Sequence, residues 1–101
     1  MFFKVHENGK KKIIAICDSE LLNKKFEEEG LQLDVNERFF KGESLEKRDL
    51  IMSIKNILDN EDISSFNAIG EDSTELLLEF GLIEKESILK IAKIPYAIIV
   101  F

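Results

Sequence analysis

The stretch from residue 12 to 22 most constrains the fold, because it reads as a strand that passes directly into a capped helix. β-branched residues crowd positions 13–16, and such residues pack better on a pleated sheet than in a helix. Asp18 follows as a candidate N-cap, whose carboxylate would accept hydrogen bonds from the first N–H groups of a helix starting at Ser19. The stretch therefore predicts a strand–helix junction that also holds Cys17, the only cysteine.

The residues before this junction predict a β-hairpin. Segments 2–7 and 12–17 look like strands, and Asn8-Gly9 between them is the strongest short-range hairpin signal. A loop of two or four residues gives the same alternation of side chains, so both registers predict the same two faces. The face expected to enter the core carries Phe3, Val5, Ile14 and Ile16. The opposite face carries His6, Ile13, Ala15 and Cys17.

Hydrophobic periodicity and capping signals predict the later elements. The first expected helix starts at Ser19 and has Lys24 and Lys25 in its last turn, and the second spans 45–58 with Ser44 as N-cap. The third begins with an Asp72–Glu75 capping box and ends at Gly81, after which Leu82 packs back on Leu77. The expected strands are 31–35 with Leu31, Leu33 and Val35 inward, 66–69, 88–92 and 96–101, with Pro95 in the last turn. The predicted core includes Phe3, Val5, Ile14, Ile16, Leu33, Ile54 and Leu77.

Length and composition predict one α+β domain. The chain has 101 residues, of which 45% are hydrophobic and 34% charged, so it is long and apolar enough to bury one core. We expect a single compact domain over 1–101 with an N-terminal hairpin, a mixed sheet packed by about three helices, and a C-terminal strand pair. A lone cysteine cannot form an internal disulfide and favours a reducing, cytoplasmic location.

The charge distribution restricts the partners that the chain can bind. The net charge is −6, and it lies entirely in residues 42–101, because residues 1–41 hold eight basic and eight acidic groups. DNA and anionic membranes are not expected as partners, since both attract basic rather than acidic surfaces. A protein or RNA partner would meet the neutral part, at Lys10, Lys11, Lys12, Lys24, Lys25, Arg38, Phe39 and Lys41.

No catalytic residue, metal or cofactor is predicted from the motifs. His6, Glu7, Cys17 and Asp18 are ligand types, but the hairpin separates His6 from Cys17 by roughly 13 Å, too far for one zinc ion. Asp18 and Glu20 bring negative charge beside Cys17 and oppose its ionisation. An alternative to a protein that only binds a partner is an enzyme with a small-molecule site. That site would lie near the Cys17-Asp18 junction and the Pro95-Tyr96 turn, and Cys17, Asp18, Gly70 and Tyr96 would form it.

Six blocks of the sequence stand out, which run from Lys4 to Glu7, Ala15 to Leu22, Lys25 to Glu28, Phe39 to Glu43, Ile69 to Ser73 and Gly81 to Ile83. In residues, order and spacing they resemble an archaeal family, the domain of unknown function numbered 424. The resemblance implies an archaeal cytosolic protein of one domain and no assigned activity. Where the family reads valine-proline-histidine-alanine-glutamine, this chain reads Ile94 to Ile98, which argues against catalysis by that histidine and glutamine here.

The function expected from the sequence is therefore binding without catalysis. The partner is expected to be another macromolecule, and the family resemblance suggests a setting in translation or RNA processing.

Overall fold

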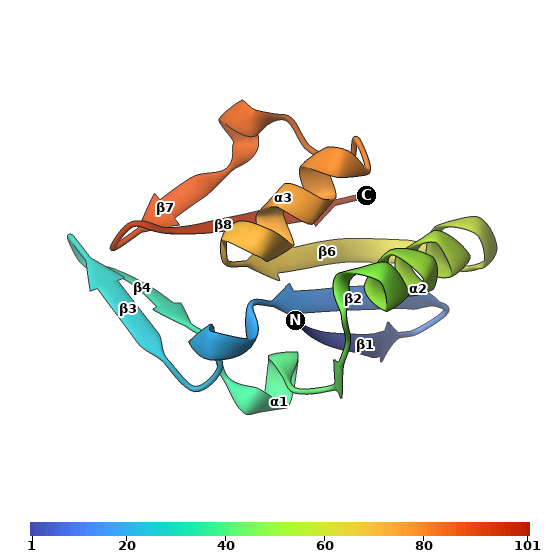
Figure 1. The fold of residues 1–101 in the computed structure, drawn as a ribbon, viewed down its shortest axis with the longest axis horizontal. Helices are drawn as coiled ribbons and strands as arrows, with labels where there is room; N and C mark the ends of the chain where they lie inside the picture. The colour runs from blue at the N-terminus through green and yellow to red at the C-terminus, as the bar shows by residue number, and fades with distance from the viewer.

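The computed structural model describes residues 1–101 as one α+β domain, as predicted (Figure 1). A six-stranded mixed sheet has the order β5-β1-β2-β6-β8-β7, and β3 and β4 form a separate two-stranded arm. The strands are β1 Phe2–Asn8, β2 Lys11–Cys17, β3 Lys25–Glu28, β4 Leu31–Asp34, β5 Glu43–Ser44, β6 Ile63–Ile69, β7 Leu89–Ile91 and β8 Ile94–Val100. The helices are α1 Glu37–Phe40, α2 Lys47–Asn60 and α3 Glu71–Glu79, with 3₁₀ turns at Ser19–Leu21 and Lys85–Ser87.

The predicted N-terminal hairpin is confirmed. β1 and β2 pair antiparallel, with His6 opposite Ile13. The turn consists of Gly9 and Lys10 rather than Asn8 and Gly9, because Asn8 still pairs with Lys11. Gly9 takes a φ of +66°, which glycine adopts without strain. The register is the one expected for the four-residue loop, with Glu7 opposite Lys12, and one further pair shortens the loop to two residues.

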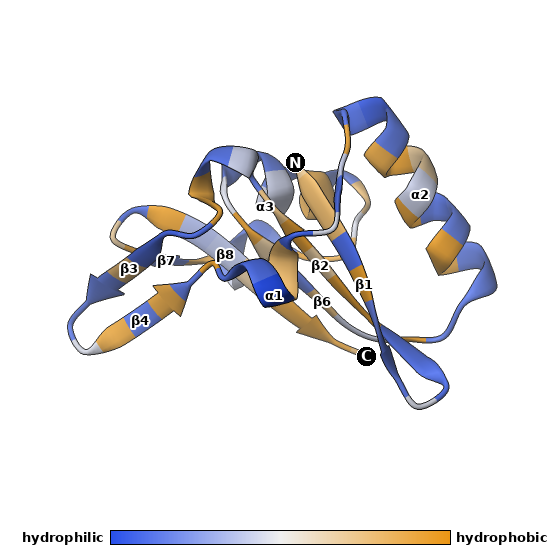
Figure 2. Ribbon diagram, turned by 90° about the horizontal axis from the view of Figure 1, so that it is seen from below, coloured by the Kyte–Doolittle hydropathy of each residue, from blue (hydrophilic) through white to orange (hydrophobic).

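The two faces of the sheet carry separate hydrophobic cores. On one face α2 and α3 cover the sheet, and the other face is partly covered by α1 and the β3–β4 arm (Figure 2). The helix-side core contains Phe3, Ile14, Ile16, Leu50, Ile54, Phe66, Ala68, Leu76, Leu77 and Ala97. The core on the arm side contains Ala15, Cys17, Leu21, Val35, Phe40 and Ile69. The predicted alternation along β2 thus holds, and both of its faces are buried.

Two of the predicted core residues are not buried. Val5 lies on the expected face but is exposed, since it is near the free end of the hairpin. Leu33 is only half-buried and Leu31 is exposed, because the two-stranded arm projects from the sheet and has no second layer over it (Figure 1). Val35, just beyond the arm, is fully buried as expected.

The predicted helix from Ser19 to Lys25 is wrong. Only a single 3₁₀ turn forms at Ser19–Leu21, and Lys25 already begins β3. Asp18 makes no side-chain hydrogen bond to this turn. The predicted helix is therefore reduced to one turn. The carboxylate of Asp18, which was expected to cap it, instead caps α3, as described below.

The two longer helices form where expected, but their caps differ from the prediction. Ser44 lies in β5, and α2 begins after Glu46, which makes no side-chain cap. At α3 the N-cap is Gly70, so the predicted Asp72–Glu75 capping box is absent. The expected C-terminal motif is confirmed: the Gly81 N–H donates to Leu78, and the Leu82 N–H donates to Leu77.

The C-terminal strands form a hairpin whose turn is Ala92-Lys93, both with positive φ. Pro95 lies inside β8 instead of in the turn, and its carbonyl accepts a hydrogen bond from the Gly70 N–H. β8 pairs antiparallel with β6, while β6 pairs parallel with β2. This strand order places the ends of β2, β6 and β8 beside one another.

Candidate functional site

Asp18 caps α3 across a gap of more than fifty residues in sequence. β2 and β6 are parallel neighbours, with Cys17 opposite Ile69, so Asp18 emerges beside the start of α3. Its carboxylate accepts hydrogen bonds from the Asp72 N–H (3.2 Å), the Ser73 N–H (2.9 Å) and the Ser73 hydroxyl (2.8 Å). These three bonds satisfy the buried carboxylate and the helix N-terminus together. Asp18 therefore has a structural role that leaves it little capacity for chemistry.

Gly70 is required by this contact. Its φ is +113°, outside the range that other residues adopt readily. A Cβ atom added to Gly70 would lie 2.2 Å from Cγ of Asp18. The glycine thus lets the backbone approach the capping carboxylate closely.

Cys17 is unsuited to nucleophilic catalysis. The side chain is fully buried on the arm side of the sheet. Burial, together with the negative charge of Asp18, raises the pKa of the Cys17 thiol to about 11. Because the thiolate is the reactive form, a thiol with this pKa is inert near neutral pH.

The residues of the predicted small-molecule site are divided between two places. Asp18 and Gly70 line a hollow of about 200 Å³, whose other charged groups are Glu20, Glu71, Asp72 and Lys93. Tyr96 instead lines a different recess, on the open part of the sheet. The hollow at Asp18 is crowded with carboxylates, so it does not fit an anionic substrate or phosphate.

The basic residues predicted to meet a partner fall into two groups. Lys10 and Lys11 are exposed at the tip of the hairpin, and Lys12 pairs with Glu7. Lys24, Lys25, Arg38 and Lys41 are exposed around α1. The ammonium group of Lys4 donates to the Arg38 carbonyl (2.6 Å), which places α1 beside the start of β1. Lys4 lies five residues before Gly9 in the turn, about 17 Å along an extended chain, so the two basic groups lie at different places along β1.

Phe39 is held in place by His6. The two rings stack with centroids 4.7 Å apart, and Nε2 of His6 donates to the Phe39 carbonyl (2.8 Å). The Asn36 side chain accepts from the Phe39 N–H (2.8 Å) and caps the short helix. Phe40 is buried, whereas Phe39 is half-buried at the rim of the recess. One face of the Phe39 ring is therefore already occupied by the imidazole.

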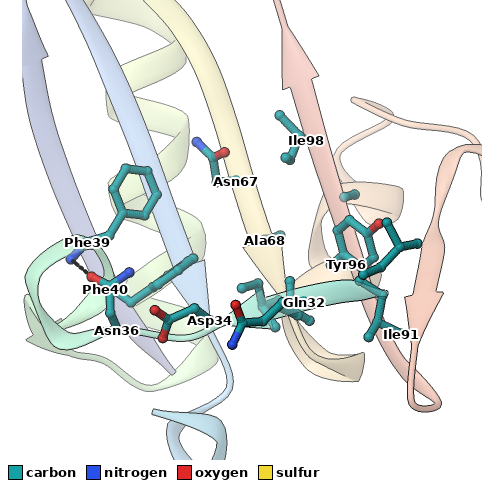
Figure 3. Close-up of a pocket in the computed structure, with 14 residues that line it drawn as sticks. Gln32, Asp34, Asn36, Phe39, Phe40, Asn67, Ala68, Ile91, Tyr96 and Ile98 are labelled. Carbon is teal, nitrogen blue, oxygen red and sulfur yellow. Dashed lines mark hydrogen bonds between the residues drawn. The ribbon is translucent and has the colours of Figure 1, made fainter. Parts of the chain in front are cut away.

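A mainly apolar recess lies on the arm side of the sheet, where α1 and the arm leave β6 and β8 uncovered (Figure 3). Its volume is about 320 Å³, and ten of its 14 lining residues are hydrophobic. Phe39 and Phe40 stand at one side, Tyr96 and Ile98 at the other, and Asn67 lies between them on β6 (Figure 3). The size and the mainly apolar lining are typical of a ligand site.

Few polar groups reach this recess. Asn67 makes only long contacts, from its amide nitrogen to the Ile14 carbonyl (3.3 Å) and to the Ser65 hydroxyl (3.4 Å). Asp34 is the one charged residue in the lining, and no cation lies within ion-pair distance of it. Around the recess, Leu31 and Ile98 are 60% and 63% exposed. The surface thus offers apolar contact with one carboxylate at its edge.

The sequence prediction missed Asn67 and Ile98 as site residues. Both were expected in strands, and the only available signal was that residues 94–101 carry no charge. Strand order decides which of these residues remain uncovered, and that order could not be read from one sequence. No three His, Cys, Asp or Glu side chains come together as a candidate metal-binding group.

Comparison with known proteins identifies the family. Residues 5–101 match the family described as "Protein of unknown function (DUF424)". The chain belongs to this family. No curated protein matches it. The chain of a crystal structure described as "an uncharacterized conserved protein from Methanopyrus kandleri" superposes with a TM-score of 0.83 at 24% identity, covering 97% of this DUF424 chain and 88% of the archaeal one. That likeness shows a shared fold.

No helix of this DUF424 member combines the length and the apolar character needed to cross a bilayer.

Proposed function

We propose that this chain is a non-catalytic binding module that docks another protein through the arm-side recess and the exposed part of β8 beside it. The recess carries the proposal, because it is mainly apolar and its lining includes the exposed side chains of Leu31 and Ile98. Contiguous apolar surface of this kind is typical of interaction sites. Burying such surface against a partner contributes favourable free energy in proportion to its area.

A protein partner is better supported than RNA. The only charged group in the recess is the Asp34 carboxylate, which would repel a phosphate backbone. The lysines that would attract RNA are split between the hairpin tip and α1, and one face of Phe39 is covered by His6. A setting in translation or RNA processing rests on the family resemblance alone and stays a prediction.

The enzyme alternative has less support. Its proposed residues Cys17 and Asp18 are buried, and the carboxylate is fully engaged in capping α3. The buried free thiol is compatible with the reducing cytoplasm that we propose as the location.

A pair of matched substitutions tests the docking surface. We expect Ile98→Arg to weaken partner capture from a native extract at least about tenfold, because it places a charge in the apolar contact. Met52→Arg is the control, since Met52 is 65% exposed on α2, against 63% for Ile98 on the opposite side of the sheet. Both variants should unfold within about 1 kcal/mol of the wild type. Capture is measured with the immobilised chain and mass spectrometry.

Equal capture by both variants would contradict the proposed surface. Capture of RNA alone, still dependent on the hairpin lysines, would point to the nucleic-acid function instead.

A further inference from the structure

The outer edge of β8 is only half covered. β7 begins at Leu89, which pairs with Tyr96, so no strand lies beside residues 97–100 on that side (Figure 1). The inner edge of β8 is paired with β6 from Tyr96 to Val100. The second half of β8 therefore has one paired edge and one free edge.

Two hydrogen bonds fix which backbone groups lie at the free edge. The Pro95 carbonyl accepts a hydrogen bond from the Gly70 N–H just after β6 (2.8 Å). The Phe101 N–H donates to the Ser64 carbonyl in β6 (3.0 Å). Successive residues of an antiparallel strand bond to opposite sides, so the odd-numbered residues face β6. The N–H and C=O groups of Ile98 and Val100 consequently point outward, where no strand pairs with them.

This free edge lacks the usual protection against strand pairing. Natural edge strands are commonly blunted by charged side chains, proline or bulges. Residues 94–101 contain no charge, and Pro95 lies in the half that β7 already covers. The side chains of Ile98 and Val100 are 63% and 77% exposed. Both the backbone and the side chains of this segment are thus available.

A hollow follows the same edge. It has a volume of about 430 Å³ and lies between β8 and the connection from α3 to β7. Leu82, Ile83 and Ile99 line it, and Glu84 is its only charged residue. Ile98 lines both this hollow and the arm-side recess, so the two lie next to each other. A neighbouring strand would lie about 4.8 Å from β8, in the space between the edge and the connection.

We infer that the free edge of β8 receives an extended apolar segment of the protein partner as an added strand. The inference rests on the proposed function and specifies how the partner is held. The Ile98 and Val100 backbones supply the hydrogen bonds, as in other cases of strand addition. Alternate side chains of the segment meet Ile98 and Val100 on one face and Leu82 and Ile83 on the other. The segment is therefore a run of about four apolar residues with a basic residue beside Glu84.

A single proline tests this inference. The Val100 N–H makes no bond within the chain, so Val100→Pro removes an outward donor while the fold is retained, as proline is tolerated at strand edges. Val100→Ala is the matched control, because it shortens the same side chain and keeps the N–H. The probe is a phage-displayed library of random twelve-residue peptides selected on the wild type, from which enriched peptides are synthesised and titrated.

Enriched peptides should be apolar and rich in β-branched residues, and should bind Val100→Pro about tenfold more weakly, with Val100→Ala within about threefold of the wild type. Absence of enrichment, or equal binding to Val100→Pro, would overturn the inference. Sedimentation showing a dimer that Val100→Pro dissociates would assign the edge to a second copy and also overturn it. Partner capture that is lost in Ile98→Arg but unaffected by Val100→Pro would reject strand addition and leave the proposed function standing.

Discussion

Gly70→Ala is expected to destabilise the protein by about 3–5 kcal/mol. The added Cβ would lie 2.2 Å from Cγ of Asp18, so the carboxylate must move away from the N-terminus of α3. The expected cost combines the loss of a helix cap, strain at a φ of +113° and steric overlap in a buried place. Urea unfolding followed by circular dichroism measures it.

Gly81→Ala is the matched control. Gly81 also has a positive φ, +72°, but nothing lies within 4 Å of an added Cβ. This substitution should cost only the backbone strain, about 1–2 kcal/mol. In an Asp18→Ala background the extra cost of Gly70→Ala should largely disappear, since the clashing side chain is gone. Equal costs for Gly70→Ala and Gly81→Ala would show that the capping contact is not what requires this glycine.

Leu77→Ala should cost about 2–5 kcal/mol of unfolding free energy. Leu77 is fully buried in α3 and packs in the helix-side core against the sheet. Its truncation removes the transfer free energy of the lost methyl groups and leaves a cavity. The measurement is the shift of the urea midpoint at constant slope.

Leu31→Ala provides the comparison for that value. Leu31 is 60% exposed on β4, so the same chemical change should stay within about 0.5 kcal/mol. A cost for Leu77→Ala below that of Leu31→Ala would mean that α3 packs with another face against the sheet.

The fold was predictable where signals were local. The Asn8-Gly9 pair predicted the hairpin, although the turn forms one residue later, and the alternation of Ile13 to Ile16 predicted the two faces of β2. The C-terminal motif at Gly81 was also local, because its glycine and the following leucine lie within one turn of the helix.

The errors arose where distant segments decide the structure. An aspartate at position 18 could cap either the turn that follows it or a helix more than fifty residues later. It caps the distant helix because the pairing of β2 with β6 places Asp18 beside the start of α3. β3 could not be recognised because Lys25 to Glu28 is mostly charged and is a strand only by pairing with β4. The turn at Ala92-Lys93 carries no glycine, so Pro95 gave the stronger but misleading turn signal.

The candidate site was not predictable for a related reason. The predicted small-molecule site relied on Cys17 and Asp18, but both residues are buried, and Asp18 caps α3. The order of the strands and the shortness of β7 decide which part of the sheet stays exposed, and they leave Ile98 and Val100 uncovered. Neither strand order nor the length of β7 can be predicted from the residues near β8 in the sequence.

Photo-crosslinking from position 98 tests the proposed docking surface most directly. The benzophenone amino acid p-benzoylphenylalanine is placed at position 98 in one sample and at position 52 in the other, and each is irradiated in native extract. We expect one protein adduct from position 98 that is absent from position 52, because position 98 lines the recess and position 52 lies on α2, outside it. The same adduct from both positions, or an adduct from position 52 alone, would contradict docking at β8.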